Sequence, residues 1–192
     1  DDYNPIAEIL DSGRYPITKH NHYRQYDTYM LFDEEDQLVN RLRYREDNYI
    51  DDKGQVRDSR ERLTLLGDAN IHEIGRAFML SRSRYIAPAT QTLRFYLEYF
   101  DPQETIEVHK DRLRWRIQYQ GTDMAVNLDR VVKPELEGHF IEVKARTWSR
   151  RDAERKTEMI AELLKELNVK TDNYLRREYL DLAQAAYHWK GS

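Results

Sequence analysis

Polar and apolar residues alternate along much of the chain, which is the pattern of strands whose two faces meet different surroundings. The clearest segments are Arg41–Arg45 and Arg112–Arg116, in which arginine occupies every second position and Leu, Tyr or Trp stands between. Three guanidinium groups spaced about 7 Å apart on one face repel one another unless something negative lies among them. The pattern therefore predicts two strands that each have an apolar face and a cationic face suited to a polyanion.

The same alternation predicts further strands, and helical spacing predicts a few helices around them. We expect strands at about residues 23–32, 38–49, 56–66, 92–100, 105–120, 123–132 and 139–147. We expect helices at about residues 5–12, 69–81, 150–167 and 173–187, and an irregular segment at 81–88. Turn residues such as Asp51–Gly54 favour hairpins between the strands. The prediction is a single α+β domain over residues 1–192, in which helices cover the apolar faces of an antiparallel sheet.

Composition narrows the classes of function. The formal net charge is −4 and the sequence pI is about 5.9, although 34% of the residues are charged. A nucleic-acid-binding domain is usually basic overall, so we expect the arginines to form a local site and do not expect a nucleic-acid partner. The absence of cysteine excludes disulfides and thiolate metal sites and fits a cytoplasmic protein. No apolar run approaches the roughly 20 residues of a membrane span, so no membrane partner is expected.

Two carboxylates stand on the polar faces of later strands. Asp129 follows Leu128, and Glu142 lies between Ile141 and Val143. Carboxylates that face a cationic set suit a metal–polyphosphate site, because Mg²⁺ or Mn²⁺ takes one or two carboxylates together with phosphate oxygens. Salt bridges to the arginines explain the same residues equally well, and the spacing leaves both interpretations open.

Five short motifs, taken in order, resemble a known family. They are Asp27-Thr28-Tyr29, Leu42-Arg43-Tyr44-Arg45-Glu46, Lys110-Asp111-Arg112, Asn127-Leu128-Asp129-Arg130-Val131 and Gly138-His139-Phe140-Ile141-Glu142. Their order and spacing over residues 23–185 resemble the CYTH domain, also called the triphosphate tunnel metalloenzyme family. The resemblance implies an antiparallel β-barrel of about eight strands that forms a tunnel, flanked by α-helices. It also implies a small-molecule triphosphate substrate and a Mg²⁺ or Mn²⁺ cofactor.

The resemblance assigns roles to individual residues. The triphosphate-binding residues that it implies are basic residues of three predicted strands: Arg41, Arg43, Arg45, Arg62, Lys110, Arg112, Arg114 and Arg116. Glu142 and Asp129 would hold the metal, and Glu142 and Lys144 are the candidate catalytic residues. Members of this family hydrolyse inorganic or organic triphosphates, or cyclise ATP to cyclic AMP.

The chain departs from the family pattern in three places. It has no opening E-x-E-x-K strand, unless that strand lies upstream of Asp1; Lys144 replaces a second glutamate; and Leu66 stands where a lysine is usual. These departures remove metal ligands and retain phosphate binders. The leading hypothesis is divalent-metal-dependent hydrolysis of a triphosphate held in a cationic tunnel. The alternatives are adenylyl cyclase activity, or a non-catalytic domain that binds a triphosphate or polyphosphate and regulates a fused nucleoside-kinase-like domain.

Overall fold

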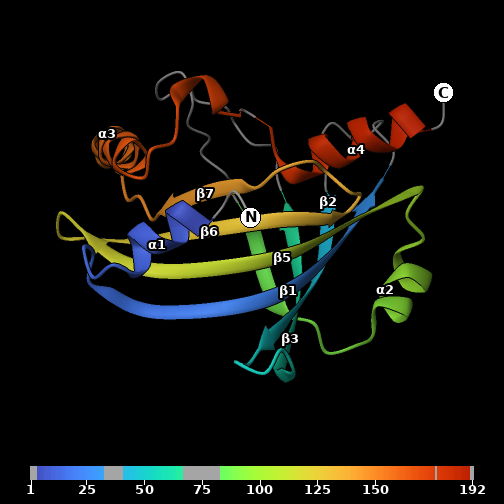
Figure 1. The fold of residues 1–192 in the computed structure, drawn as a ribbon. Coiled ribbons are helices and arrows are strands. Elements are labelled where there is room, and N and C mark those ends of the chain that lie inside the picture. The colour runs from blue at the N-terminus through green and yellow to red at the C-terminus, as the bar shows by residue number, and fades with distance from the viewer. Residues whose placement is uncertain (1–3, 33–40, 67–82, 176, 191–192) are drawn as a thin grey trace.

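The computed structural model describes residues 4–32, 41–66, 83–175 and 177–190, which form an α+β fold around one antiparallel sheet (Figure 1). Seven strands lie in the order β4-β3-β2-β1-β5-β6-β7. They are β1 (Ile17–Leu31), β2 (Arg41–Ile50), β3 (Val56–Leu66), β4 (Ser83–Pro88), β5 (Glu104–Tyr119), β6 (Thr122–Lys133) and β7 (Phe140–Ala145). The predicted fold class is confirmed. The predicted closed barrel is not seen, because β4 and β7 are the two edges of the sheet and no pairing joins them within the described residues.

In the described part of the chain four α-helices flank the sheet: α1 (Asn4–Asp11), α2 (Leu93–Phe100), α3 (Arg150–Glu166) and α4 (Tyr179–Lys190). A 3-10 helix, Thr171–Asn173, lies between α3 and α4. The start of α3 follows its sequence signal, since the Ser149 hydroxyl accepts a hydrogen bond from the backbone N–H of Asp152 at 3.1 Å. Within the described part of the chain, no helix has the length and apolar character needed to cross a membrane.

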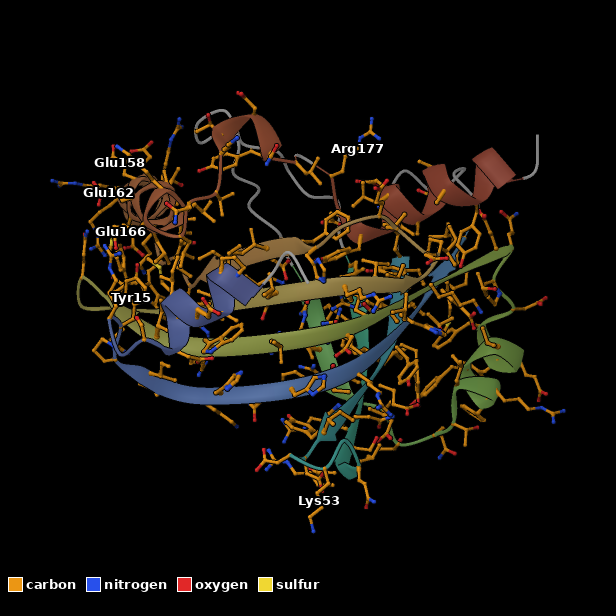
Figure 2. All side chains as sticks on the ribbon, viewed as in Figure 1. Tyr15, Lys53, Glu158, Glu162, Glu166 and Arg177 are labelled. Carbon is orange, nitrogen blue, oxygen red and sulfur yellow. The ribbon has the colours of Figure 1, made fainter. Side chains whose placement is uncertain are left out.

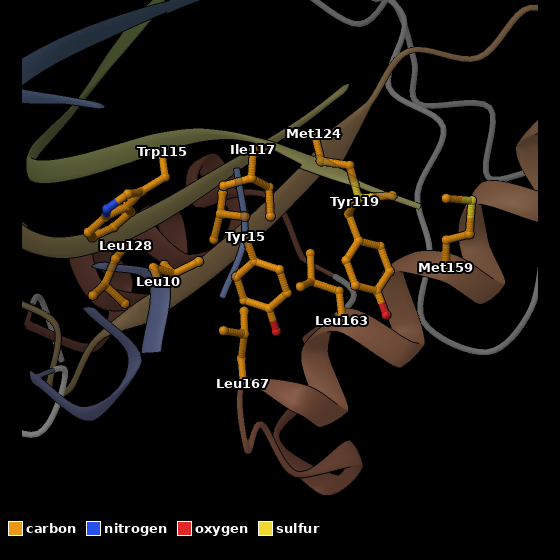
Figure 3. Close-up of a cluster of buried hydrophobic side chains, with 11 residues drawn as sticks. Leu10, Tyr15, Trp115, Ile117, Tyr119, Met124, Leu128, Met159, Leu163 and Leu167 are labelled. Atoms are coloured by element: carbon orange, nitrogen blue, oxygen red, sulfur yellow. The ribbon is translucent and has the colours of Figure 1, made fainter. Parts of the chain in front are cut away.

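One face of the sheet, here called the outer face, carries the apolar side chains of the alternating strands. Figure 3 shows its larger cluster, in which Trp115 of β5 packs with Leu10 of α1 and Leu163 of α3. A second cluster joins Met30 of β1 to Tyr96 of α2. Each fully buried side chain of this size contributes about 1.5–3 kcal/mol, so these clusters fix the helices on the sheet.

Helix α3 also makes polar contacts where it meets the sheet. Glu166 accepts hydrogen bonds from the hydroxyls of Tyr15 at 2.7 Å and Tyr119 at 2.9 Å. Glu158, Glu162 and Glu166 follow one another at four-residue spacing along one side of the helix (Figure 2). The apolar side of α3 therefore faces the sheet, and its acidic side faces outward except at the end held by the two tyrosines.

The opposite face of the sheet, here called the charged face, carries the arginine side chains. Helix α4 covers one end of it, where Leu180 and Ala183 pack against Ile106, Val108 and Val131. These strand residues alternate in the same register as the arginines, so the charged face becomes apolar under α4. The rest of the charged face is left to polar side chains.

The sheet curves toward its charged face. In Figure 1, β2 and β3 cross behind the layer of β1, β5, β6 and β7. The right-handed twist between neighbouring strands accounts for this crossing.

Three elements differ from the sequence prediction. Residues 92–100 were expected as a strand but form α2, because Thr92 caps the helix by accepting from the backbone N–H of Phe95. Segment 81–88 was expected to be irregular, but β4 pairs there with β3. The last helix begins at Tyr179 rather than near residue 173. The predicted helix at 69–81 lies outside the described residues.

Candidate functional site

Charged side chains from six strands gather on the charged face. The cations at the centre of this face are Arg43 and Arg45 of β2, Arg62 of β3, Lys110, Arg112 and Arg114 of β5, and Lys144 of β7. The carboxylates are Asp27 of β1, Asp47 of β2, Asp129 of β6 and Glu142 of β7. Seven cations thus face four carboxylates, and the alternation of each strand puts them all on one side of the sheet.

Asp27 is fully buried and holds two of the cations. Arg45 donates to both of its oxygens, from Nε to Oδ1 at 2.5 Å and from Nη2 to Oδ2 at 2.7 Å. Lys110 Nζ lies 3.2 Å from Oδ2. Burial acts to raise the pKa of Asp27, but Arg45 and Lys110 outweigh it and hold the pKa below its usual range. Burial lowers the pKa of Lys110 to about 7, although Asp27 opposes the shift. Asp27 is therefore a fixed anion, whereas Lys110 titrates near neutral pH.

Arg112 is 1% exposed and ties β5 to β6 and β7. Its Nε and Nη2 donate to the two oxygens of Asp129 at 2.6 and 2.5 Å, and Nη2 also donates to Glu142 Oε2 at 3.2 Å. Asp129 accepts a further hydrogen bond from the Tyr179 hydroxyl at the start of α4. Burial acts to raise the pKa of Glu142, but Lys144, 2.9 Å away, and Arg112 hold it well below its usual range. Glu142 is therefore charged, and both oxygens of Asp129 are engaged by hydrogen bonds.

Two of these seven cations, Arg43 and Arg114, form no ion pair with a described carboxylate. Arg43 lies over the ring of Tyr29, 6.0 Å from the centroid. Arg114 donates from Nε to the neutral amide oxygen of Asn127 at 2.6 Å. Burial, followed by the charge of Arg112, lowers the pKa of Arg114, and the opposing effects of Tyr23 and Asp47 do not outweigh them. The excess of positive charge is therefore located at particular residues.

Unsatisfied hydrogen-bond donors accompany the excess charge. Arg43 Nε, Arg62 Nε and Arg112 Nη1 are buried without an acceptor among the described protein residues. Arg62 pairs with Asp47 through another nitrogen, and Arg112 uses its other two nitrogens on Asp129. A buried donor without an acceptor costs about 1–3 kcal/mol. The charged face is thus incomplete by both charge and hydrogen bonding.

The structure brings most of the predicted site residues together and leaves two at the margin. Arg41 shares the charged face but lies at the first position of β2, with Leu66 as its register partner. Arg116 is exposed near the turn between β5 and β6, and its guanidinium lies 3.6 Å from Asp123. The remaining predicted residues, namely Arg43, Arg45, Arg62, Lys110, Arg112, Arg114, Asp129, Glu142 and Lys144, belong to the cluster described above.

Sequence reasoning missed four residues that organise the cluster. They are Asp27 and Asp47, which hold arginines, Gln25, which donates to Asp47 Oδ1 at 2.5 Å, and Tyr179, which donates to Asp129. Alternation along residues 23–29 places Gln25 and Asp27 on one face and was a usable signal for those two. Nothing in the sequence near Tyr179 indicates that it reaches across to β6.

The carboxylates fit a divalent metal only in part. Among the described residues, no group of three or more His, Asp or Glu side chains is arranged to hold a metal ion. Both oxygens of Asp129 accept hydrogen bonds from Arg112, and one of them also accepts from Tyr179, so Asp129 fits the holding of an arginine better than the binding of a metal. Glu142 lies at the side of the cluster and is partly exposed, so it is the better candidate ligand.

Solved structures match the chain, whereas no family model and no curated protein does. The PH1819 protein from Pyrococcus horikoshii OT3 is similar with a TM-score of 0.68 and 22% identity, over 93% of this chain and 92% of that one. The conserved hypothetical protein Pfu-838710-001 from Pyrococcus furiosus is similar with a TM-score of 0.57 and 20% identity, over 93% of each chain. At these identities the similarity shows a shared fold and assigns no activity.

Proposed function

We propose that the charged face binds the triphosphate group of a small molecule, either inorganic tripolyphosphate or an organic triphosphate. The observation that carries the proposal is the imbalance of charge, with seven cations against four carboxylates in a cluster whose centre, at Arg45, Lys110 and Arg112, is buried. Two cations about 7 Å apart repel by roughly 2 kcal/mol at an effective dielectric constant of about 20. A chain of phosphates would relieve this repulsion and supply acceptors for the free N–H groups.

The paired and unpaired arginines would have different parts in binding. Arg43 and Arg114, which no described carboxylate neutralises, are free to bind phosphate oxygens bidentately. Arg112 is fixed by Asp129 and still keeps one N–H group for the ligand. Because Asp129 already holds the guanidinium of Arg112 in place, little side-chain entropy of Arg112 is lost when the ligand binds.

Closure of the sheet into a tunnel belongs to the same proposal. A further strand paired with the edges β4 and β7 would turn the curved sheet into the barrel that the family resemblance implies. The phosphate chain would then have cationic side chains on several sides. The described residues supply the seven strands and the cationic lining, and the eighth strand remains a prediction.

Isothermal titration calorimetry with tripolyphosphate, in the absence of metal, tests the binding. We expect an affinity that falls as salt is added, because charged contacts are screened. The Arg43→Gln/Arg114→Gln variant removes two charge-assisted contacts worth about 1.5–3 kcal/mol each, so its affinity should fall at least about a hundredfold. The matched control is Arg94→Gln, which removes an exposed arginine of α2. An equal loss in both variants, or no binding by the wild type, contradicts the proposal.

Metal-dependent hydrolysis of the bound triphosphate is the second candidate function, and the position of Glu142 favours it. Its side chain is 31% exposed, whereas those of Asp27 and Asp129 are 0% exposed. Glu142 is therefore the carboxylate suited to share Mg²⁺ or Mn²⁺ with phosphate oxygens, and the ion would act there as a Lewis acid. Lys144 and Arg112, which contact Glu142, would stabilise charge that develops on the phosphoryl oxygens.

Phosphate release from tripolyphosphate and ATP, measured with Mg²⁺ and with Mn²⁺, tests this second function. Hydrolysis predicts release that is abolished in Glu142→Gln while tripolyphosphate still binds without metal. Formation of cyclic AMP and pyrophosphate from ATP would instead indicate a cyclase. Tight binding without turnover under either metal would leave a non-catalytic domain that senses a triphosphate and regulates an attached domain.

A further inference from the structure

Two tyrosines and three arginines form an aromatic patch at the end of the charged face that α4 does not cover. The tyrosines are Tyr23 of β1 and Tyr49 of β2, which are register partners with ring centroids 4.7 Å apart. Arg114 lies over the ring of Tyr23 at 5.3 Å, and Arg57 and Arg60 lie over the ring of Tyr49 at 5.9 and 5.8 Å. Tyr23 is only 5% exposed, so the accessible part of the patch is the partly exposed ring of Tyr49 together with the exposed side chains of Arg57 and Arg60.

The patch is continuous with the phosphate-binding cations. Tyr23 is the register partner of Arg112 on β5 as well as of Tyr49 on β2, so one row across the sheet passes from Asp129 through Arg112 to both rings. Strands lie about 4.8 Å apart, which places Tyr49 about 10 Å from Arg112. A group attached to one end of a phosphate chain held by Arg112 and Arg114 would meet these rings.

A β-bulge helps to build the patch. Asp58 pairs with Tyr49 and Val56 pairs with Ile50, which leaves Arg57 as an extra residue in β3. Alternation would put Arg57 on the outer face, but its guanidinium lies over Tyr49 on the charged face. Arg60 reaches the same ring from its regular position in the strand. Both arginines are exposed, so ring and cations are accessible together.

We propose that this aromatic patch binds the heteroaromatic ring of a nucleoside triphosphate whose phosphates occupy the charged face. The proposal rests on the proposed triphosphate binding and specifies its substrate class. Nucleobases stack on tyrosine rings and on arginine guanidinium planes, and this stacking does not require hydrogen bonds to the edges of the base. The other end of the charged face is covered by the apolar cluster under α4, and neither Tyr23 nor Tyr49 belongs to that cluster.

A cross-strand structural pair is the competing explanation of the two tyrosines, since aromatic pairs stabilise neighbouring strands. That role would keep the tyrosines independent of any ligand. A longer polyphosphate chain on Arg57 and Arg60 is the competing ligand, and it would be insensitive to the rings. Both alternatives differ from base stacking in how the affinity responds to removal of the base.

The test compares ATP with ribose 5-triphosphate, which lacks the base and carries the same phosphate charge. Calorimetry without metal, at one salt concentration, should give ATP an affinity about tenfold higher in the wild type, because stacking contributes about 5- to 150-fold per base. In Tyr49→Leu the ratio of the two affinities should fall to nearly one, through loss of ATP affinity alone. Tyr49→Phe should keep the ratio, and so should the control Tyr99→Leu, which changes an exposed tyrosine of α2.

A second variant avoids any effect on folding. Arg57→Gln/Arg60→Gln changes two exposed side chains, and it should lower the ratio at least about threefold. Equal wild-type affinities for ATP and ribose 5-triphosphate would contradict binding of the base to the aromatic patch, and so would a ratio of affinities that is unchanged in Tyr49→Leu. Either result would leave the proposed triphosphate binding intact. Absence of binding by ATP, ribose 5-triphosphate and tripolyphosphate alike would overturn the proposed function itself.

Discussion

Trp115 and Arg112 lie three residues apart on β5, are both almost completely buried, and face opposite sides of the sheet. Trp115 belongs to an apolar cluster that α1 and α3 complete. Arg112 belongs to a cluster in which cations outnumber carboxylates and one of its own N–H groups has no acceptor among the described residues. On the outer face, helices of the same chain cover the apolar cluster around Trp115. The charged face, by contrast, has positive charge and N–H groups that a ligand of opposite charge could neutralise.

This difference separates stability from function. Apolar burial stabilises the fold directly, while a buried ion pair roughly balances its own desolvation cost. Cations beyond those that the carboxylates neutralise add repulsion and unsatisfied donors. Their presence on the charged face is explained by a ligand that supplies negative oxygens, and the predictions below test the two faces against each other.

The largest effect is expected from breaking the buried pair at Arg112. Arg112→Met leaves the Asp129 carboxylate buried without its cation, and we expect a loss of about 3–5 kcal/mol in the free energy of unfolding. Replacing both partners, in Arg112→Met/Asp129→Leu, should recover most of that stability but not tripolyphosphate binding. Urea unfolding and calorimetry on the three proteins measure both quantities.

The comparison on the outer face is Leu163→Ala. It removes a fully buried side chain of α3 and should cost about 2–5 kcal/mol, with tripolyphosphate affinity unchanged at temperatures where the variant is folded. If this variant loses affinity as strongly as Arg112→Met, or if the double variant at Arg112 and Asp129 binds normally, the separation of the two faces is wrong.

A smaller effect is expected from the titration of Lys110. Its pKa is lowered to about 7 by burial, so between pH 7 and about 10.4 the unfolded chain binds more protons than the folded protein. Stability should therefore rise with pH in this range, and most clearly between pH 7 and 9, before tyrosines such as Tyr29, with a pKa of about 12, begin to matter. Urea unfolding of the wild type and of Lys110→Met measures the contribution.

In Lys110→Met the rise of stability with pH should be shallower than in the wild type. Asp27 remains paired with Arg45 in this variant, so the fold should be retained. If stability rises equally steeply with pH in the two proteins, the pKa of Lys110 is not lowered in the folded protein, which would contradict this prediction.

Alternation predicted the two faces of the sheet because each strand side chain has its direction set by the backbone alone. The arginines of β2 and β5 and the carboxylates Asp129 and Glu142 share one face, as expected. Alternation also left metal binding and salt bridges equally open for these carboxylates. The structure favours salt bridges, since Arg112 contacts both of them.

Tertiary contacts account for what the sequence could not predict. The aromatic residues of 92–100 are typical of a strand, yet Thr92 caps a helix and Tyr96 is buried in the core from it. The contact of Tyr179 with Asp129 joins residues 50 positions apart, and no local pattern encodes it. The curvature of the sheet depends on twist accumulated over all of its strands.

The most direct test of the central claim is the single variant Arg114→Gln, with unfolding free energy and tripolyphosphate affinity measured on the same protein. Arg114 forms no ion pair with a described carboxylate, so removing its charge should leave stability within about 0.5 kcal/mol of the wild type, or raise it. Its affinity for tripolyphosphate should fall about tenfold or more. A loss of stability above about 1 kcal/mol with unchanged affinity would contradict the account, because Arg114 would then serve the fold rather than a ligand.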